Sequence, residues 1–215
     1  MRTRLLVLAK TPVPGRVKTR LCPPCTPAEA ATLAAAALAD TVDTVSSTTG
    51  ADPVLVIEGD LPAPAGWARI PQRGGSLGAR IANAFADTAV PGMPSLLIGM
   101  DTPQVTPAVL GAAIGLLAGD GTDAVLGLAE DGGWWALGLR DPACAGLVRD
   151  VPTSTPQTGE LTLKALRGLR ITHLPVLRDV DTIEDARAVA AMRPESRFAG
   201  VLAARGERQP AAASR

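Results

Sequence analysis

Short apolar runs alternate with helix-like segments along the chain, and this alternation constrains the fold more than any other feature. Five runs are rich in valine, leucine or isoleucine, and two weaker ones continue the pattern: residues 4–9, 53–57, 95–99, 124–128 and 134–139, then 69–72 and 171–176. Brief apolar runs bounded by turn residues are typical of buried strands in a largely parallel sheet. The pattern therefore predicts an α/β fold of three layers (α/β/α), with helices covering a mostly parallel, twisted sheet.

The helix-like segments are identified by their first residues. The capping box Thr26-Pro-Ala-Glu29 predicts a long alanine-rich helix to about Val45, and a second box at Thr182 predicts a helix to about Met192. Similar starts predict helices over residues 77–88, 107–118 and 156–168. Residues 205–215 are polar and rich in alanine and proline, so we expect one domain over residues 1–204 and a frayed tail.

Composition narrows the class of protein. The 215 residues suit one sizeable domain, and the equal numbers of basic and acidic residues, 21 of each, give no nucleic-acid signature. Two phenylalanines, three tryptophans and no tyrosine argue against base-stacking platforms. No apolar run approaches the ~20 residues of a membrane span, and we see no signal peptide. We expect a cytoplasmic protein with no membrane span and no nucleic-acid partner; the oligomeric state is left open.

The three cysteines do not indicate a disulfide framework, because their number is odd. Cys22 and Cys25 have the spacing of a dithiol redox pair ahead of a helix, a position that can lower a thiol pKa. A redox role is therefore a minor alternative. Zinc is disfavoured, since Cys144 and the single histidine, His173, show no paired ligand spacing.

A cationic loop follows the first predicted strand. Lys10, Arg16, Lys18 and Arg20 lie close together around Gly15, with two prolines and no acid between them. Turn N–H groups and cationic side chains both suit phosphate oxygens. Open α/β sheets bind ligands at the carboxyl ends of their strands, where this loop lies. We therefore predict a phosphate site; the alternative is a solvated basic connection.

Two aspartates also follow predicted strands. Asp101 comes directly after the run at residues 95–99, and Asp181 lies between the last strand and the helix start at Thr182. Carboxylate oxygens at such an edge suit Mg²⁺, which in turn grips a pyrophosphate. Turn formation and helix capping are the alternatives. If the two strand ends are adjacent, Asp101 and Asp181 share one metal ion.

The sequence Asp131-Gly132-Gly133-Trp134-Trp135 separates two predicted strands. Its glycines allow a backbone to approach a ligand closely, although Asp-Gly is also a strong hairpin signal. The two tryptophans are expected on opposite faces, one in the core and one lining a pocket.

A second glycine-rich segment covers residues 72–80 and includes Gln72, Gly78 and Arg80. A glycine-rich turn leading into a helix is a plausible site for an anion or a base. The order of its glycines is not that of a dinucleotide fingerprint, and the chain has no P-loop, so NAD and P-loop ATPase functions are disfavoured. A single histidine leaves little room for a Ser-His-Asp triad.

Together these segments resemble a bacterial group of small glycosyltransferases, some linked with radical-SAM genes or arsenosugar biosynthesis. The resemblance covers about residues 4–192 and rests on six motifs in order: Ala9-Lys-x-Pro-x-Pro-Gly-x-Val-Lys-Thr-Arg-Leu21, Gln72-x5-Gly78-x-Arg80, Ile98-Gly-x-Asp101-x-Pro103, Asp131-Gly-Gly-Trp-Trp-x-Leu-Gly-Leu139, Thr155-Pro-Gln157 and Asp179-Val-Asp-Thr-x-Glu-Asp185.

That group is similar to nucleotidyltransferases of the GT-A (nucleotide-diphospho-sugar transferase) fold, including 2-phospholactate and molybdenum-cofactor guanylyltransferases. The resemblance implies that Gly15, Arg16 and Lys18 belong to a triphosphate loop. It also implies that Asp101 and Asp181 are the first and second metal ligands.

Two departures from the related pattern change these implications. The loop begins Thr11-Pro-Val-Pro14 where a glycine-rich stretch is usual, which shifts phosphate contacts toward Lys10, Lys18 and Arg20. Pro103 stands where an Asp-x-Asp pair has its second acid.

The resulting hypothesis is a transferase dependent on Mg²⁺ or Mn²⁺ that uses a nucleotide-activated donor. The metal bridges Asp101, Asp181 and the donor pyrophosphate, while Lys18 stabilises developing negative charge. Asp131 positions or deprotonates a small-molecule acceptor. Further contacts are expected from the nucleotide-binding set Lys10, Gly15, Arg16, Arg20, Gln72, Gly78 and Arg80, and from the acceptor-binding set Gly132, Gly133 and Trp134.

Two reactions fit this site. In glycosyl transfer the donor is a nucleotide sugar, and in nucleotidyl transfer it is a nucleoside triphosphate that releases pyrophosphate. The resemblance favours glycosyl transfer. A protein that binds nucleotides without catalysis is the alternative from another class.

Overall fold

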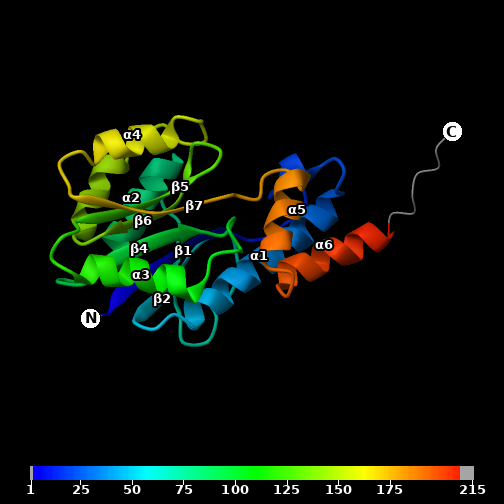
Figure 1. Ribbon diagram of the computed structural model, residues 1–215, viewed down its shortest axis with the longest axis horizontal. Coiled ribbons are helices and arrows are strands. Elements are labelled where there is room, and N and C mark those ends of the chain that lie inside the picture. Colours follow the sequence, from blue (N-terminus) through cyan, green and yellow to red (C-terminus); the bar gives the residue numbers. More distant parts are fainter. Residues whose placement is uncertain (1, 209–215) are drawn as a thin grey trace.

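The computed structural model describes residues 2–208. Seven strands lie in this part of the chain: β1 (Thr3–Lys10), β2 (Ala51–Glu58), β3 (Ala68–Pro71), β4 (Ser95–Gly99), β5 (Ala124–Ala129), β6 (Trp134–Leu139) and β7 (Ile171–Leu177). They form one sheet in the order β3-β2-β1-β4-β6-β5-β7 (Figure 1). All neighbours are parallel except β6, which runs antiparallel to β4 and β5. The predicted α/β class with a mostly parallel sheet is confirmed.

Six α-helices and two 3-10 helices occupy the described residues: α1 (Pro27–Ser46), α2 (Leu77–Thr88), α3 (Pro107–Ala118), α4 (Thr158–Ala165), α5 (Ile183–Met192) and α6 (Arg197–Arg208), with η1 (Thr19–Leu21) and η2 (Pro142–Val148). Both predicted capping boxes are present, at Thr26 and at Thr182. Helix α4 is shorter than predicted, because it begins at Thr158 after a turn in which Ser154 has a positive φ of 60°.

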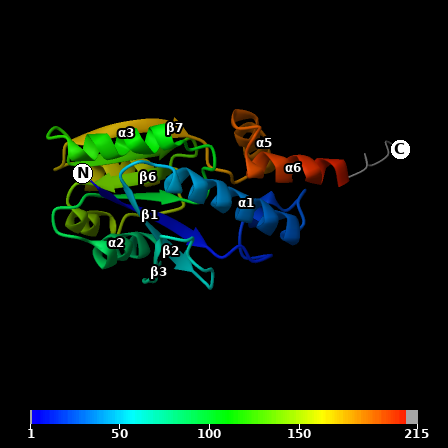
Figure 2. The ribbon, with the colours of Figure 1, turned by 90° about the horizontal axis from the view of Figure 1, so that it is seen from below.

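Apolar side chains alternate between the two faces of the sheet, as the pleat requires. In β1, Leu5 and Val7 face a first core cluster shared with α1 and α3, whereas Leu6 faces a second cluster shared with α2 and η2. Figure 2 shows α2 on one side of the sheet and α3 on the other. The three predicted layers are therefore present.

A third core cluster lies beyond the sheet, where α5 and α6 pack beside α1 (Figure 1). Phe198 of α6 is only 1% exposed there. The carboxylate of Asp40, on α1, accepts hydrogen bonds from the Arg197 and Phe198 backbone N–H groups, over 3.1 and 2.9 Å. Asp40 thus caps the start of α6.

Helix α6 was not predicted, and it continues past the expected domain end at residue 204. Arg205, the first residue of the predicted tail, is buried, and its Nη2 donates to the Pro24 carbonyl over 2.5 Å. Residues 209–215, the rest of that tail, lie outside the described residues. In the part of the chain that the structure covers, no helix is both long and apolar enough to cross a membrane.

Candidate functional site

The loops that follow β1, β4 and β7 meet at one edge of the sheet. Strands β1 and β4 are parallel neighbours, so both end at this edge. Strands β6 and β5 separate β4 from β7, yet the loops bridge that gap: the Val180 N–H donates to the Asp101 carbonyl over 2.9 Å. The loops that carry Asp101 and Asp181 are therefore in contact, although the strands β4 and β7 are not neighbours in the sheet.

Lys18 lies between these two aspartates. Its Nζ is 2.6 Å from Asp101 Oδ1 and 3.7 Å from Asp181 Oδ1, and it also donates to the Val180 carbonyl. The Lys18 side chain is only 8% exposed. The structure thus brings together three of the predicted site residues, the lysine and both proposed metal ligands.

The rest of the cationic loop is more open. Arg20 pairs with Asp181 over 2.8 Å, and Arg16 is exposed. Gly15 has a φ of +75°, which a side chain would strain, although an added Cβ would meet no atom within 4 Å. The glycine therefore serves the shape of the turn rather than a close contact within the protein.

Burial and the neighbouring carboxylates raise the pKa of Asp179 to about 7. Burial contributes most, followed by the negative charges of Asp101, Asp131 and Asp181, while Lys18 acts in the opposite direction. Asp179 was not among the predicted site residues; its place in the same Asp179-Val-Asp181 motif was the available signal. The excess of negative charge suits a bound cation.

The raised pKa of Asp179 predicts a pH-dependent stability. The carboxyl has an ordinary value of 3.8 and a folded value of about 7, so the folded state binds more protons between these limits and loses stability as the pH rises through them. Asp179→Asn cannot ionise. We expect it to be more stable than the wild type by about 1–3 kcal/mol at pH 8, allowing for partial burial, and nearly equal at pH 4. Urea unfolding without divalent metal measures this; equal differences at both pH values would contradict it.

The side chains of Asp101 and Asp181 offer carboxylate oxygens, which are suitable ligands for a divalent metal. Both present carboxylate oxygens to a single ammonium group, so the two can also approach one metal ion. Across residues 2–208, no group of three or more His, Cys, Asp or Glu side chains is arranged to hold a metal. Mg²⁺ is commonly held by one or two carboxylates plus phosphates and waters, which matches this pair.

A second polar group lies at the ends of β1, β2 and β3. Lys10 Nζ is 3.4 Å from Glu58 Oε2, and Arg80 forms an ion pair with the same oxygen. The Gln72 side-chain amide donates to the Ala9 carbonyl over 2.8 Å. Its Oε1 accepts from Arg80 Nη1 over 3.5 Å. Lys10, predicted from the cationic loop, is therefore a neighbour of Gln72 and Arg80, which were predicted from the second glycine-rich segment.

Glu58 joins these residues and was missed from the sequence. Burial acts to raise its pKa, but the pairs with Arg80 and Lys10 outweigh burial and hold that pKa below its usual range. Its position at the end of an apolar run, like that of Asp101 after its own strand, was the available signal.

Gly78, predicted for the same nucleotide site, makes a close packing contact inside the protein. It is buried in α2, where an added Cβ would lie 2.4 Å from the Arg149 carbonyl oxygen, just after η2. Because α2 packs this closely against the end of η2, there is no room for a side chain at Gly78.

Gly78→Ala is expected to lower the free energy of unfolding by about 1–3 kcal/mol, because backbone must move to relieve the clash. Nucleotide affinity of the folded variant should be unchanged. Gly111→Ala in α3 is the matched control: its Cβ meets nothing within 4 Å, and alanine should stabilise that helix slightly. Chemical denaturation and nucleotide titration measure the two effects. A loss of affinity without a loss of stability would restore Gly78 to the nucleotide site.

The Asp131 turn is the hairpin between β5 and β6. Asp131 is exposed, and its Oδ1 accepts from the Gly133 N–H over 2.8 Å. Gly132 has a φ of +87°, and a Cβ on it would lie 2.0 Å from the Pro156 carbonyl oxygen. The glycine is therefore required by the close approach of the segment before α4.

The two tryptophans after this turn point to opposite faces, as predicted. Trp135 belongs to the first core cluster and donates to the Pro175 carbonyl over 3.0 Å. Trp134 packs against the second cluster and donates to Thr162 Oγ1 over 3.1 Å. Both indole N–H groups therefore have partners inside the protein.

The structure does not favour the redox role considered for Cys22 and Cys25. Cys22 and Cys25 are free, and burial raises the pKa of the Cys25 thiol, which lowers its thiolate content.

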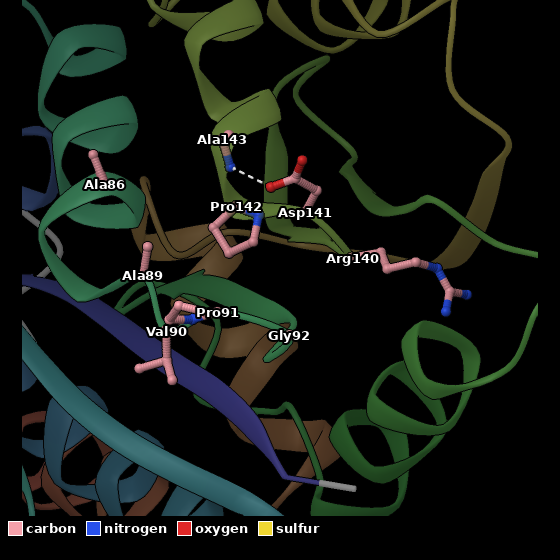
Figure 3. Close-up of a pocket in the computed structure, with 9 residues that line it drawn as sticks. All are labelled: Ala86, Ala89, Val90, Pro91, Gly92, Arg140, Asp141, Pro142 and Ala143. Carbon is pink, nitrogen blue, oxygen red and sulfur yellow. Dashed lines mark hydrogen bonds between the residues drawn. The ribbon is translucent and has the colours of Figure 1, made fainter.

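The cavity drawn in Figure 3 belongs to the other edge of the sheet. It has a volume of about 570 Å³ and lies between the end of α2 and the start of η2, lined by residues 86, 89–92 and 140–143. These residues come before β4 and after the antiparallel β6, so they lie far along the strands from Asp101. None of the predicted site residues lines it.

Solved structures identify the class of fold. A protein from Desulfovibrio desulfuricans G20, provisionally called a nucleotide-diphospho-sugar transferase, matches with a TM-score of 0.83 at 24% identity over 96% of each chain. A CMP:2-keto-3-deoxy-manno-octonic acid synthetase in complex with CTP matches at 0.57 and 12% identity, over 91% of this chain and 99% of the other. The chain has the nucleotide-diphospho-sugar transferase fold.

A manganese complex of Rv0371c from Mycobacterium tuberculosis H37Rv matches with a TM-score of 0.53 at 19% identity, over 88% of this chain and 98% of the other. No curated protein matched the sequence. A family model matches residues 32–155, and the chain belongs to that family, described as "Uncharacterized protein conserved in bacteria (DUF2064)".

Proposed function

We propose that this protein is a divalent-metal-dependent transferase with a nucleotide-activated donor, and that the donor is a nucleotide sugar. The observation that carries the proposal is the convergence of Asp101 and Asp181 on one cation, the Lys18 ammonium, at the carboxyl edge of the sheet. Ligands of open α/β folds bind at this edge. The neighbours described as a nucleotide-diphospho-sugar transferase and as a CTP-bound synthetase support a nucleotide donor.

Asp101 and Asp181 are the residues that hold Mg²⁺ or Mn²⁺ in this proposal. The metal supplies positive charge that neutralises the donor pyrophosphate. The manganese complex of Rv0371c supports a metal at this type of fold. Lys18 and Arg20 lie against the same carboxylates, so their cationic groups are available to the donor phosphates.

We assign the two ends of the donor to two different groups of polar residues at this edge of the sheet. Lys10, Gln72 and Arg80 lie together around Glu58 at the ends of β1 to β3, and we assign them to the nucleoside end of the donor. Their side chains offer both donors and acceptors to a base or ribose. The phosphate end is assigned to Lys18, whose loop leads from the end of β1 toward Asp101.

The acceptor is assigned to the Asp131 turn. The Asp131 carboxylate is exposed and close enough to Asp179 to raise the pKa of that residue. Its charge thus acts on the same group of carboxylates as Asp101 and Asp181, and its Oδ1 accepts from the Gly133 N–H. We expect it to orient an acceptor hydroxyl and to accept the proton released as the bond forms. Gly132, Gly133 and Trp134 are expected to shape the same side.

Nucleotidyl transfer is the second candidate. It is favoured by structural similarity to a cytidylyltransferase from Leptospira borgpetersenii, with a TM-score of 0.56 at 13% identity. In that reaction an acceptor phosphate attacks the α-phosphorus and pyrophosphate leaves. In glycosyl transfer the acceptor attacks the sugar carbon and a nucleoside diphosphate leaves. The leaving groups are chemically distinct.

Product analysis separates these reactions. The protein is incubated with Mn²⁺ and a panel of nucleotide sugars, or with nucleoside triphosphates and sugar phosphates, and products are followed by ³¹P NMR. Metal-dependent release of a nucleoside diphosphate supports the proposal, and pyrophosphate release would transfer the assignment to nucleotidyl transfer. Metal-dependent binding without any turnover across several acceptor classes would favour a non-catalytic nucleotide-binding protein.

A further inference from the structure

Lys18 already fills the space between the two carboxylates. An ammonium group has three N–H donors, and three oxygens lie around Lys18 Nζ: Asp101 Oδ1 at 2.6 Å, Asp181 Oδ1 at 3.7 Å and the Val180 carbonyl. With 8% of its side chain exposed, Lys18 is the least accessible partner in this cluster, since Asp101 and Asp181 are 46% and 35% exposed. The Lys18 ammonium is thus largely buried, whereas both carboxylates are partly open to solvent.

The backbone keeps Lys18 in this position. Its φ of 50° and ψ of 37° are left-handed, a conformation that residues other than glycine adopt infrequently. Its carbonyl accepts from the Leu21 N–H over 3.0 Å, and Leu21 is fully buried in the third core cluster. The core beneath η1 therefore maintains an otherwise unfavourable backbone conformation that aims the side chain at the carboxylates.

A divalent cation on Asp101 and Asp181 is incompatible with this position of the ammonium. The metal and the Lys18 ammonium would share the same two carboxylate groups, and two cations so close together repel strongly in a partly buried site. One must leave before the other binds. Phosphate oxygens of a donor offer the lysine an alternative anionic partner.

We propose that Lys18 acts as a built-in counter-cation that closes the metal site of the free protein and moves to the donor phosphates when donor and metal bind. This inference rests on the proposed function, because it requires Asp101 and Asp181 to hold a metal. It also predicts how binding depends on the nucleotide. Metal alone has to compete with Lys18 for the two carboxylates. When metal and nucleotide bind together, the metal pairs with the carboxylates and Lys18 pairs with the donor phosphates.

Lysine labelling tests the competition in the wild-type protein. The chain contains three lysines, Lys10, Lys18 and Lys164, and the first and last are exposed internal controls. An amine-reactive reagent with mass-spectrometric detection should label Lys18 at least about tenfold more slowly than Lys164, because its ammonium is paired and buried. Adding Mn²⁺ without nucleotide should raise Lys18 labelling in step with metal binding, measured by electron paramagnetic resonance. Mn²⁺ binding that leaves Lys18 labelling unchanged would overturn the proposal.

A charge-removal variant tests the same point from the metal side. Lys18→Met leaves Asp101 without its cationic partner and Asp181 paired only with Arg20, so it should bind Mn²⁺ alone at least about tenfold more tightly than the wild type. Lys164→Met removes the same charge from an exposed position on α4, outside the proposed site, and should change Mn²⁺ affinity less than about threefold. Circular dichroism establishes folding, and if Lys18→Met does not fold, the labelling experiment decides alone.

The outcomes separate this inference from the proposed function. If the wild type binds Mn²⁺ alone as tightly as Lys18→Met does, the metal site stands and the counter-cation role is wrong. If neither protein binds Mn²⁺, with or without nucleotide, the proposed metal site is wrong and the counter-cation role is lost with it.

Discussion

Asp101→Asn is expected to lower the metal-dependent rate of donor turnover at least about 100-fold, because charge stabilisation by a bound metal is worth several kcal/mol. The substitution preserves shape and removes a negative charge from the pair that converges on Lys18. Asp101 is 46% exposed, and the largely buried Lys18 ammonium keeps Asp181 and the Val180 carbonyl as partners, so the substitution should change the fold's stability little. Initial rates at saturating Mn²⁺ measure the effect.

Asp120→Asn is the matched control for that experiment. Asp120 is exposed in the connection between α3 and β5, at the edge of the sheet opposite Asp101, and its variant should keep the wild-type rate. If Asp101→Asn retains more than about a tenth of the wild-type rate, the metal is held elsewhere or is not used.

Phe198→Ala is expected to lower the free energy of unfolding by about 3–5 kcal/mol. Phe198 is only 1% exposed and packs with α1 and α5 in the third core cluster, so alanine leaves a cavity. Its backbone N–H is also held by Asp40, which keeps the helix start in place and limits collapse into that cavity. Guanidinium denaturation measures the change.

Met192→Ala is the control for Phe198→Ala, since Met192 lies on α5 with 62% of its surface exposed and should cost less than about 0.5 kcal/mol. A loss below about 1 kcal/mol for Phe198→Ala would mean that α6 does not dock on α1 as described.

The sheet and five of the six α-helices in the described residues were predictable because their signals are local, although α4 is shorter than predicted. Residues 95–99 and 134–139 coincide with β4 and β6, since each strand is a single apolar run closed by turn residues. The capping box at Thr26 placed the start of α1 in the same way. The antiparallel direction of β6 follows from the hairpin at Asp131, which the sequence offered as one of two interpretations.

Helix α6 was missed although its start has one local signal, since Ser196 accepts a hydrogen bond from the Ala199 N–H over 3.1 Å as an N-cap residue does. The rest of what stabilises this start is remote. The first N–H groups of α6 bond to Asp40, 157 and 158 residues earlier in the chain, and no pattern near Arg197 reveals that partner. The same limit applies to Gly78, whose lack of a side chain is explained by the Arg149 carbonyl of a distant segment.

Most residues of the candidate site could be predicted from the sequence, whereas the contacts between them could not. Asp101 and Asp181 were identified because the carboxyl ends of parallel strands meet at one edge. The position of Lys18 between them depends on a left-handed backbone at a residue other than glycine, which residue type does not indicate. Glu58 was missed because a single acid at a strand end resembles an ordinary turn residue.

The most direct test of the central claim is the melting temperature of the wild type with nucleotide sugars and nucleoside triphosphates, each with and without Mn²⁺. A ligand at 100 times its dissociation constant stabilises the fold by about 2.7 kcal/mol, which is readily measured as a rise in melting temperature. The account predicts a rise that requires both nucleotide and Mn²⁺ and that Asp101→Asn abolishes. A nucleotide-induced rise of the same size without metal, or one retained by Asp101→Asn, would contradict it.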